Sequence, residues 1–550
     1  MRAQHQTMSE FDYIIIGAGS AGCVLAEKLG QDTTKSILVI EAGPLDNHLM
    51  IHVPAGVYSA WRNPKLNWNY DTEPESALLQ RQVFMPRGKV VGGSSSINSM
   101  VYMRGHPCDY DQWSNELGLQ DWSYGDCLPY FKAGEKSDRG ADQWRGDSGR
   151  LGVTRGSYDN PLYDAFLQAG EEAGQGTSND LNGFDPEGVS RFDATRWNGR
   201  RCSAAVAFLR PAMKRGNVSL VVNAQVMNVE FDGRRATGVS LKHRGQLRSV
   251  KAGNEVILSG GAINSPQLLM LSGIGSAQHL REMGISPRED RPAVGENLQD
   301  HASVILQNAC TREFPVHRVD QPHKKFAAGA RWVFSRGGVA ASNIWEAGGL
   351  IRSSDEVAYP DIQYHFGPVG FAYQGNKISL TQAYSMHIDL LRPRSRGTVK
   401  LASKNPLVKP LLNFNYYAHP KDLEDMLQGV RKGRSLFAQR AFDTFRGVSI
   451  DPPPSVTETT QLKHWIRSVT ETDFHPCGTC RMGIDSDSVV DPEFRVRGFD
   501  NLRVVDASVI PRIVSGNLNA PTQMLAARAA DYISKTPQLG RIDAEFAFHR

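Results

Sequence analysis

The segment Tyr13-Ile14-Ile15-Ile16-Gly17-Ala18-Gly19-Ser20-Ala21-Gly22 decides how this chain begins to fold. Its apolar residues predict a buried parallel strand, and its glycines permit a tight turn that brings backbone N–H groups and a helix N-terminus against a pyrophosphate. A second apolar run, 37–40, ends at Glu41, whose carboxylate can accept hydrogen bonds from a ribose without a 2′-phosphate. Since all these features occur in order within the first 45 residues, the sequence predicts a bound dinucleotide rather than a merely structural glycine turn.

The size and composition of the chain limit what kind of protein it is. At 550 residues it exceeds the size at which one hydrophobic core stops growing, so two or more domains are expected. A net charge of +4, without a block of lysines and arginines, argues against nucleic acid as a partner. No uninterrupted apolar stretch reaches the roughly 18 residues of a transmembrane helix, and residues 1–6 are not followed by the apolar core of a signal peptide. Peripheral attachment to a membrane stays open.

The seven cysteines are odd in number and scattered, which does not describe a disulfide framework. A reducing compartment fits better, so we predict a cytoplasmic protein, with attachment to the inner face of the membrane left open. Cys477-Gly478-Thr479-Cys480 is formally a CxxC motif. A redox role would need a thioredoxin-like context and zinc would need a second pair, so we interpret the two residues as packed thiols and predict no metal site.

The order of predicted elements indicates an α/β fold assembled from distant segments. Strands at 218–230, 236–241 and 248–258 predict a small meander, and the strand at 501–506 could close onto the N-terminal sheet. Beyond about residue 300 the pattern changes to alternating strands and amphipathic helices, which predicts a second domain whose sheet is solvated or faces a cleft on one side. The strands of that domain are expected at 361–365, 383–391 and 397–401, and its helices at 420–437 and 459–469.

The chain resembles the glucose–methanol–choline (GMC) family of flavoproteins over essentially its whole length. The resemblance rests on Gly17, Gly19, Gly22 and Glu41, on the glycine- and serine-rich loop 86–98, and on segments 261–275, 294–301 (VGENLQDH), 475–483 (HPCGTCRMG) and 517–522 (NLNAPT). Within the family it is most similar to bacterial aliphatic alcohol, sorbose and choline dehydrogenases. The resemblance implies a Rossmann-like FAD-binding domain, a parallel sheet plus β-meander, formed by residues 1–155, 206–305 and 471–550. It also implies an α+β substrate domain over a mostly antiparallel sheet, formed by residues 156–205 and 306–470.

The resemblance implies FAD as the cofactor, with its flavin end under the loop 92–99 and adenine contacts from the backbone around residues 225–226. Some family members attach the flavin covalently through a histidine that precedes the asparagine of this loop. Ile97 stands there in this chain, and because an alkyl side chain cannot form that bond, we expect noncovalent FAD. The predicted cofactor-binding residues are Gly17, Gly19, Ser20, Ala21, Gly22, Glu41, Ala42, Arg87, Gly92, Gly93, Ser94, Asn98, Ser99, Met100, Val101, Val226, Asp506, Ala507, Asn517, Pro521 and Thr522.

Oxidation of an alcohol requires a base, because the flavin accepts the hydride but not the hydroxyl proton. An alcohol has a pKa of about 15 and a histidine about 6.5, so proton loss must be coupled to hydride loss in a preorganised site. The resemblance implies His475 as the base and Asn519, 44 residues later, as the second catalytic residue, whose amide donates to the developing alkoxide. His301 and His365 are interpreted as structural, and Asn517 as support for the flavin or its loop.

The segment 342–349 resembles the stretch in which choline-oxidising members place a glutamate against trimethylammonium. Trp345 and Glu346 are therefore the predicted substrate-pocket residues, with a structural salt bridge as the alternative for Glu346. Members that act on neutral alcohols carry a similar glutamate, so we expect a primary alcohol, aliphatic or polyol-like, with choline as runner-up. A quinone or dye-like electron acceptor is expected. An oxidase that uses oxygen, a flavin-containing lyase and a nicotinamide reductase are the alternatives, and the oligomeric state is open.

Overall fold

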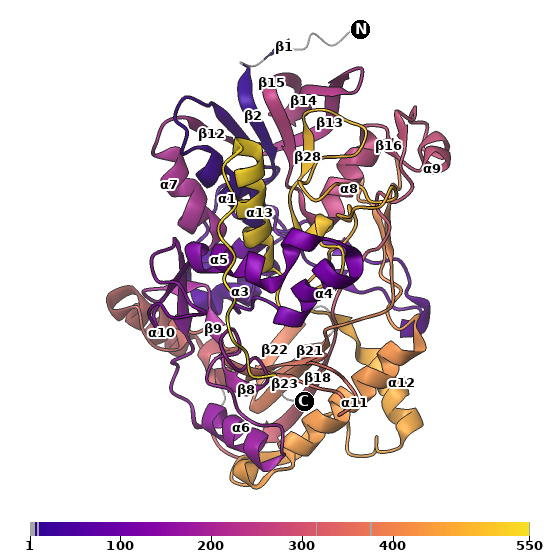
Figure 1. The fold of residues 1–550 in the computed structure, drawn as a ribbon. Helices are drawn as coiled ribbons and strands as arrows, with labels where there is room; N and C mark the ends of the chain where they lie inside the picture. Colours follow the sequence, from indigo (N-terminus) through magenta and orange to yellow (C-terminus); the bar gives the residue numbers. More distant parts are fainter. Residues whose placement is uncertain (1–5, 8–9, 315, 375–376, 549–550) are drawn as a thin grey trace.

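The computed structural model describes residues 6–7, 10–314, 316–374 and 377–548 (Figure 1). A parallel sheet in the upper half runs in the order β12 (Val218–Val221), β3 (Ile37–Ile40), β2 (Phe11–Ile16), β15 (Gln246–Leu258) and β28 (Leu502–Val504). The predicted return of the C-terminal strand to the N-terminal sheet is thus confirmed, because β28 pairs with β15. The first half of β15 pairs with β1 (Gln6–Thr7) and with the meander.

The meander consists of β13 (Ala224–Asp232), β14 (Arg235–His243) and the start of β15, all antiparallel, as predicted. The strand predicted at 218–230 is, however, two strands. Its first part, β12, is the parallel edge strand beside β3, and the chain then turns at Asn223, which has φ of 52°. This left-handed conformation, which asparagine tolerates better than most residues, separates β12 from β13.

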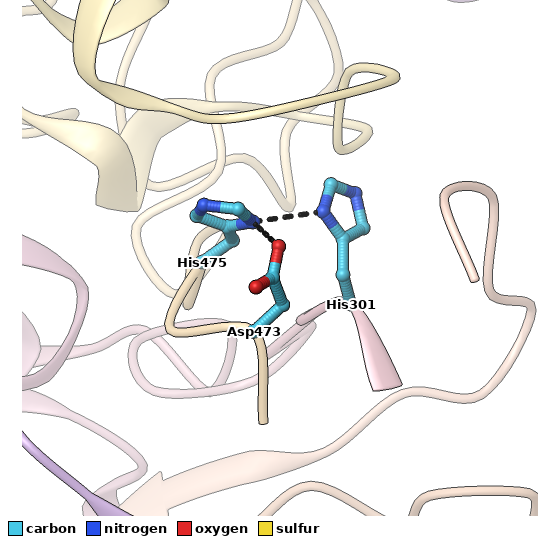
Figure 2. Close-up of side chains that lie close together, drawn as sticks. All are labelled: His301, Asp473 and His475. Carbon is cyan, nitrogen blue, oxygen red and sulfur yellow. Dashed lines mark hydrogen bonds and ion pairs between the residues drawn. The ribbon is translucent and has the colours of Figure 1, made fainter. Parts of the chain in front are cut away.

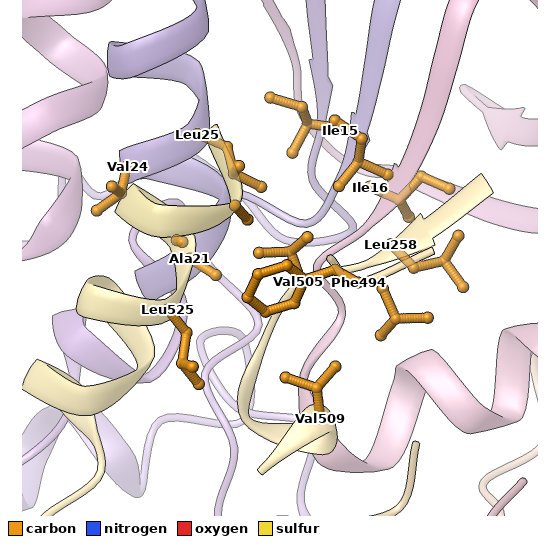
Figure 3. Packing of buried hydrophobic residues seen from close by; sticks show 14 of the residues in the cluster. Ile15, Ile16, Ala21, Val24, Leu25, Leu258, Phe494, Val505, Val509 and Leu525 are labelled. Carbon is orange, nitrogen blue, oxygen red and sulfur yellow. The ribbon is translucent and has the colours of Figure 1, made fainter. Parts of the chain in front are cut away.

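Helices α1 (Ser20–Leu29) and α13 (Asn519–Ser534) pack against each other, and α1 packs against β2 and β3 of the parallel sheet (Figure 3). Ile14 and Ile15 of β2 and Leu25 of α1 are fully buried in this core. A Cβ atom on Gly22 would lie 1.9 Å from the carbonyl oxygen of Gly17. The glycine therefore permits the close approach of α1 to the preceding turn, which fixes where the N-terminus of α1 lies.

A second, antiparallel sheet lies in the lower half of Figure 1, in the order β26-β18-β23-β20-β19-β8. Helices α6 (Pro161–Glu172), α11 (Pro420–Phe437) and α12 (Thr459–Val469) pack with it, and the last two occupy the predicted ranges. Residues alternate between faces, so that on β20 His365 lines a cavity while its neighbours Tyr364 and Phe366 belong to the core beneath. The strands are β8 (Gly188–Arg191), β18 (Ala302–Cys310), β19 (Ala347–Ile351), β20 (Ile362–Gly367), β23 (Ala383–Leu390) and β26 (Arg446–Asp451).

Two further strands concern the predicted composition of the second sheet. The strand expected at 397–401 is β24 (Thr398–Lys400), which pairs with β25 (Leu411–Asn413) in a separate hairpin, so its assignment to the second sheet was wrong. The short strand β27 (Glu471–Thr472) pairs with the start of β18. It thereby brings the segment that follows it, which contains His475, to the edge of the second sheet. Among the described residues, none of the helices is long and apolar enough to cross a bilayer.

Candidate active site

A cavity of about 1130 Å³ extends from the glycine turn of the parallel sheet to the second sheet. Of the residues predicted to contact FAD, all but Gly22, Gly92 and Pro521 line it. Gly22 instead permits helix packing, Gly92 forms a turn with φ of 90°, and Pro521 is buried in the first turn of α13. Residues that were not among the predicted site residues also line the cavity, notably 258–265, Gln307 and His387.

The end of the cavity at the parallel sheet fits a dinucleotide. A Cβ atom on Gly93 would lie 2.7 Å from Cα of Gly19, so the two glycine loops meet at the level of their backbones and leave room for a ligand beside them. The N-terminus of α1 opens there at Ser20, where a phosphate is favoured. The carboxylate of Glu41 accepts hydrogen bonds from the N–H groups of Ala18 (3.0 Å) and Gly43 (2.8 Å), and burial raises its pKa to about 7.

Other predicted cofactor residues hold the surrounding loops in place. The carboxylate of Asp506 accepts hydrogen bonds from the N–H groups of Gly261 and Ser508, both at 2.8 Å. Arg87 donates to the carbonyl oxygen of Phe474 at 2.7 Å. Ile97 is buried but lines the cavity, so its alkyl group lies beside the space that the flavin is predicted to occupy.

At the other end, three residues converge on the imidazole of His475, and Figure 2 shows two of them, Asp473 and His301. Its Nδ1 lies 3.1 Å from Oδ2 of Asp473 and 3.0 Å from Nδ1 of His301. Its Nε2 lies 3.1 Å from Nδ2 of Asn517, whose Oδ1 accepts a hydrogen bond from Gln363 at 3.3 Å. Because an amide NH₂ can only donate, Nε2 is the acceptor and the ring proton lies on Nδ1.

The backbone of His475 is anchored as firmly as its ring. Its N–H donates to Oδ1 of Asp300 at 2.7 Å, while Oδ2 of Asp300 accepts from the hydroxyls of Thr472 and Tyr416, both at 2.5 Å. Burial lowers the pKa of His475 to about 4, so the imidazole is neutral at physiological pH. A neutral, oriented imidazole with its acceptor nitrogen in a cavity is suited to take up a proton.

A second buried pair lies next to this centre. Nδ1 of His365 lies 2.8 Å from Oδ2 of Asp389. Burial alone would lower the pKa of His365, but the hydrogen bond that its protonated ring donates to Asp389 and the charge of Asp473 raise it to about 8. His301 and His365, interpreted from the sequence as structural, therefore both belong to the site. Their contacts join strands far apart in sequence, and no local pattern marks them.

Both groups are compact enough to be considered as metal sites. The potential ligand atoms of His301, Asp473 and His475 lie within 4.8 Å of one another, and so do those of His365, Asp389 and Asp473. Hydrogen bonds and ion pairs account for these short distances. The absence of a metal from the site stays a prediction.

The position of Asn519 differs from the sequence prediction. Its Oδ1 accepts hydrogen bonds from Oγ of Ser20 (2.8 Å) and Nε2 of Gln523 (3.3 Å), so it links α13 to the glycine turn. The chain becomes helical at Asn519, which places this side chain against α1, whereas Asn517 lies in the preceding loop. The asparagine in contact with His475 is therefore Asn517. Two asparagines two residues apart cannot be told apart by spacing alone.

Glu346 does not line the cavity, contrary to its assignment to the substrate pocket. Only 1% of it is exposed, and its carboxylate accepts hydrogen bonds from Nη1 of Arg196 (2.8 Å) and the N–H of Tyr158 (2.7 Å). The alternative of a structural salt bridge thus describes it. Trp345 does line the cavity, within a wall of aromatic rings that also contains Tyr58, Trp61, Phe84, Phe371 and Phe474.

The ion pair of Glu346 leads to a prediction about stability. Glu346→Gln leaves the buried guanidinium of Arg196 without its counter-ion, and breaking such a pair costs about 3 kcal/mol or more. We expect a melting temperature several degrees lower but nearly unchanged kcat/KM, because the carboxylate does not reach the cavity. Thermal unfolding of the flavin-loaded protein measures the first and turnover well below that temperature the second. A large selective loss of activity on a cationic alcohol would instead return Glu346 to the substrate pocket.

Comparison with known proteins decides the family. The N-terminal GMC oxidoreductase family model matches residues 11–303 and the C-terminal one matches residues 393–526. The chain belongs to the GMC oxidoreductase family. Like its relatives it is a flavin-dependent oxidoreductase of the class that acts on CH–OH donors, and its Rossmann-like fold with a second, substrate-binding part is the one predicted.

Several curated relatives and solved structures are similar to this GMC oxidoreductase over nearly its whole length. It is 45% identical to the oxygen-dependent choline dehydrogenase of Staphylococcus saprophyticus, over 95% of this chain and 94% of the relative. It is also 45% identical to that of Rhizobium etli, over 97% of each chain. Among solved structures, it resembles pyridoxine 4-oxidase from Mesorbium loti (TM-score 0.86, 29% identity, 95% and 98% of the two chains). A formate oxidase variant from Aspergillus oryzae is similar too (TM-score 0.89, 26% identity, 96% and 99%).

Proposed function

We propose that this protein oxidises a primary alcohol to the aldehyde, with His475 as the general base and Asn517 as the hydrogen-bond donor to the substrate oxygen. The observation that carries the proposal is the pair of atoms Nε2 of His475 and Nδ2 of Asn517, 3.1 Å apart in the cavity. A hydroxyl group that lies beside both atoms and displaces this hydrogen bond can give its proton to Nε2 and receive a hydrogen bond from Nδ2. FAD, when bound, supplies the acceptor for the hydride.

The contacts around His475 support the role of base. Oδ2 of Asp473 lies 3.1 Å from Nδ1, where its charge stabilises the imidazolium that forms when Nε2 takes the proton. Asn517 offers its amide where negative charge develops on oxygen, and Gln363 holds that amide in place. A protonated His365, with its pKa raised to about 8, adds positive charge to the same region.

For the substrate we propose choline, the runner-up of the sequence analysis. Two features support it: the names of the curated relatives, and the aromatic wall, whose ring faces can bind a quaternary ammonium. A neutral primary alcohol is the second candidate. The burial of Glu346 against Arg196 favours this candidate, because the carboxylate that was expected to attract a cation does not line the cavity.

The two candidates can be separated with a pair of substrates of equal shape. Choline and 3,3-dimethylbutan-1-ol differ in one atom and one charge, so cation–π attraction acts only on the first. We expect kcat/KM for choline to be about tenfold or more higher, measured as anaerobic bleaching of the flavin absorbance. Equal values, or a preference for the uncharged alcohol, would establish the second candidate. Product formed without bleaching would indicate a lyase.

A quinone is the proposed electron acceptor, with oxygen as the alternative. The quinone is carried over from the resemblance to bacterial dehydrogenases, whereas the relatives named oxygen-dependent choline dehydrogenase and the structurally similar oxidases favour oxygen. Mixing the reduced protein with either acceptor and following the return of the flavin absorbance gives both rates. The faster acceptor at its working concentration is the one the protein uses.

The mode of flavin attachment is a separate prediction. Since Ile97 cannot form a covalent bond to the flavin, acid precipitation should release the yellow colour into the supernatant. Absorbance spectra of pellet and supernatant provide the measurement. Flavin that stays with the pellet would contradict the prediction.

A further inference from the structure

Helix α10 (Pro322–Ser335) carries the most exposed aromatic residues of the chain, as far as the structure describes it. Phe334 is 89% exposed and Phe326 is 79% exposed, and Val333 between them is 55% exposed. Residues i, i+7 and i+8 lie on one face of a helix, so these three form a single apolar surface. Figure 1 shows α10 standing out at the side of the molecule. An exposed apolar face of this kind marks an interaction site.

Basic residues accompany that face along the chain. From 321 to 343 the sequence contains Lys324, Lys325, Arg331 and Arg336 and neither aspartate nor glutamate. A short helix with exposed phenylalanines on one face and lysines and arginines beside them has the composition of a helix that lies in the interface of an anionic membrane. Its 14 residues are too few to span a bilayer, which takes about 20.

The opposite face of α10 is fixed to the body of the protein. Trp332 is buried, its Nε1 donates to the carbonyl oxygen of Gly199 at 2.7 Å, and the guanidinium of Arg336 lies 4.4 Å from its ring centroid. Trp332 also packs with Val53. Val53 directly precedes η1 (Pro54–Gly56) and α3 (Val57–Trp61), and the latter supplies two aromatic residues of the cavity wall.

We propose that α10 docks this protein on the surface of a membrane rich in anionic phospholipids, with Phe326, Val333 and Phe334 inserted among the acyl chains. Lys324, Lys325 and Arg331 contact the phosphate groups. Because α10 is joined through Trp332 and Val53 to the wall of the cavity, docking brings that wall to the membrane side of the molecule. A lipid-soluble electron acceptor would then be at hand, although the docking itself does not depend on the proposed chemistry.

Sedimentation with vesicles tests the inference on the flavin-loaded protein. Vesicles of phosphatidylcholine with about 30% phosphatidylglycerol should carry the protein down, and vesicles of phosphatidylcholine alone should carry much less. Phe326→Ser combined with Phe334→Ser should lower the partition coefficient by tenfold or more, since insertion of the two rings is lost. Lys324→Gln combined with Lys325→Gln should remove most of the preference for the anionic vesicles.

Ile484→Ser provides the matched control, because Ile484 is also a strongly exposed apolar residue but lies in a loop of the other half of the molecule. It should bind vesicles like the wild type, and all variants should keep their flavin and their rate of bleaching by alcohol in solution. Should the double phenylalanine variant fold poorly, Phe334→Ser alone replaces it. Wild-type protein that ignores anionic vesicles overturns the proposal. The proposal is also overturned if the wild type is a dimer and the phenylalanine substitutions convert it to a monomer without changing vesicle binding.

Discussion

Replacement of His475 by alanine should lower kcat/KM by about 10²- to 10⁴-fold while the flavin stays bound, because it removes the general base without touching the dinucleotide end of the cavity. The measurement is the anaerobic rate of flavin bleaching at limiting substrate. His387→Ala is the matched control. His387 also lines the cavity and desolvation also lowers its pKa to about 4, but it is only half-buried and its Nδ1 faces Oγ of Ser303 at 3.2 Å. Its replacement should lower kcat/KM far less than that of His475.

The pH dependence follows from the same group. Burial lowers the pKa of His475 to about 4, so the neutral form that can accept a proton predominates above that value. kcat/KM should therefore be level between about pH 6 and the pKa of His365 at about 8, and fall by about tenfold per unit once the pH drops below 4. The alanine variant should lose this acid limb. Near wild-type turnover in His475→Ala, or an equal loss in His387→Ala, would remove His475 from the mechanism.

The features that could be predicted from the sequence are those encoded by neighbouring residues. The turn that contains Gly17, Gly19 and Gly22, the ranges of α11 and α12, and the return of β28 to the sheet all follow from local periodicity and from motifs. Local periodicity also has limits: β12 and β13 look like one strand because the single left-handed residue between them is an asparagine, which does not by itself mark a break.

The contacts that define the site could not be predicted in this way. His301 reaches His475 across 174 residues, and Arg196 reaches Glu346 across 150 residues. A buried carboxylate has the same sequence signature whether it meets a substrate cation or an arginine of its own chain. The partner is decided by the second sheet and its flanking loops, which place Arg196 beside Glu346 and leave Trp345 facing the cavity.

The two asparagines before α13 give the sharpest test of the site, because the chain itself supplies the control. Asn517→Ala should depress kcat by about 10²- to 10³-fold with little change in KM, since its amide donates where the charge of the alkoxide develops. Asn519→Ala should leave kcat within a few-fold of the wild type, because its partners are Ser20 and Gln523 rather than His475. Its effect should fall on flavin retention, through the lost link to the glycine turn.

Steady-state kinetics and the ratio of flavin to protein separate these outcomes. Asn517→Asp adds a further prediction: a carboxylate beside Nε2 raises the pKa of His475 and repels the developing alkoxide, so kcat should fall and the acid limb of the pH profile should move upward. If instead Asn519→Ala were the variant with the large loss of kcat and Asn517→Ala were nearly silent, the donor would be the residue that the family spacing first indicated. The 3.1 Å contact between Asn517 and His475 would then serve only to orient the imidazole.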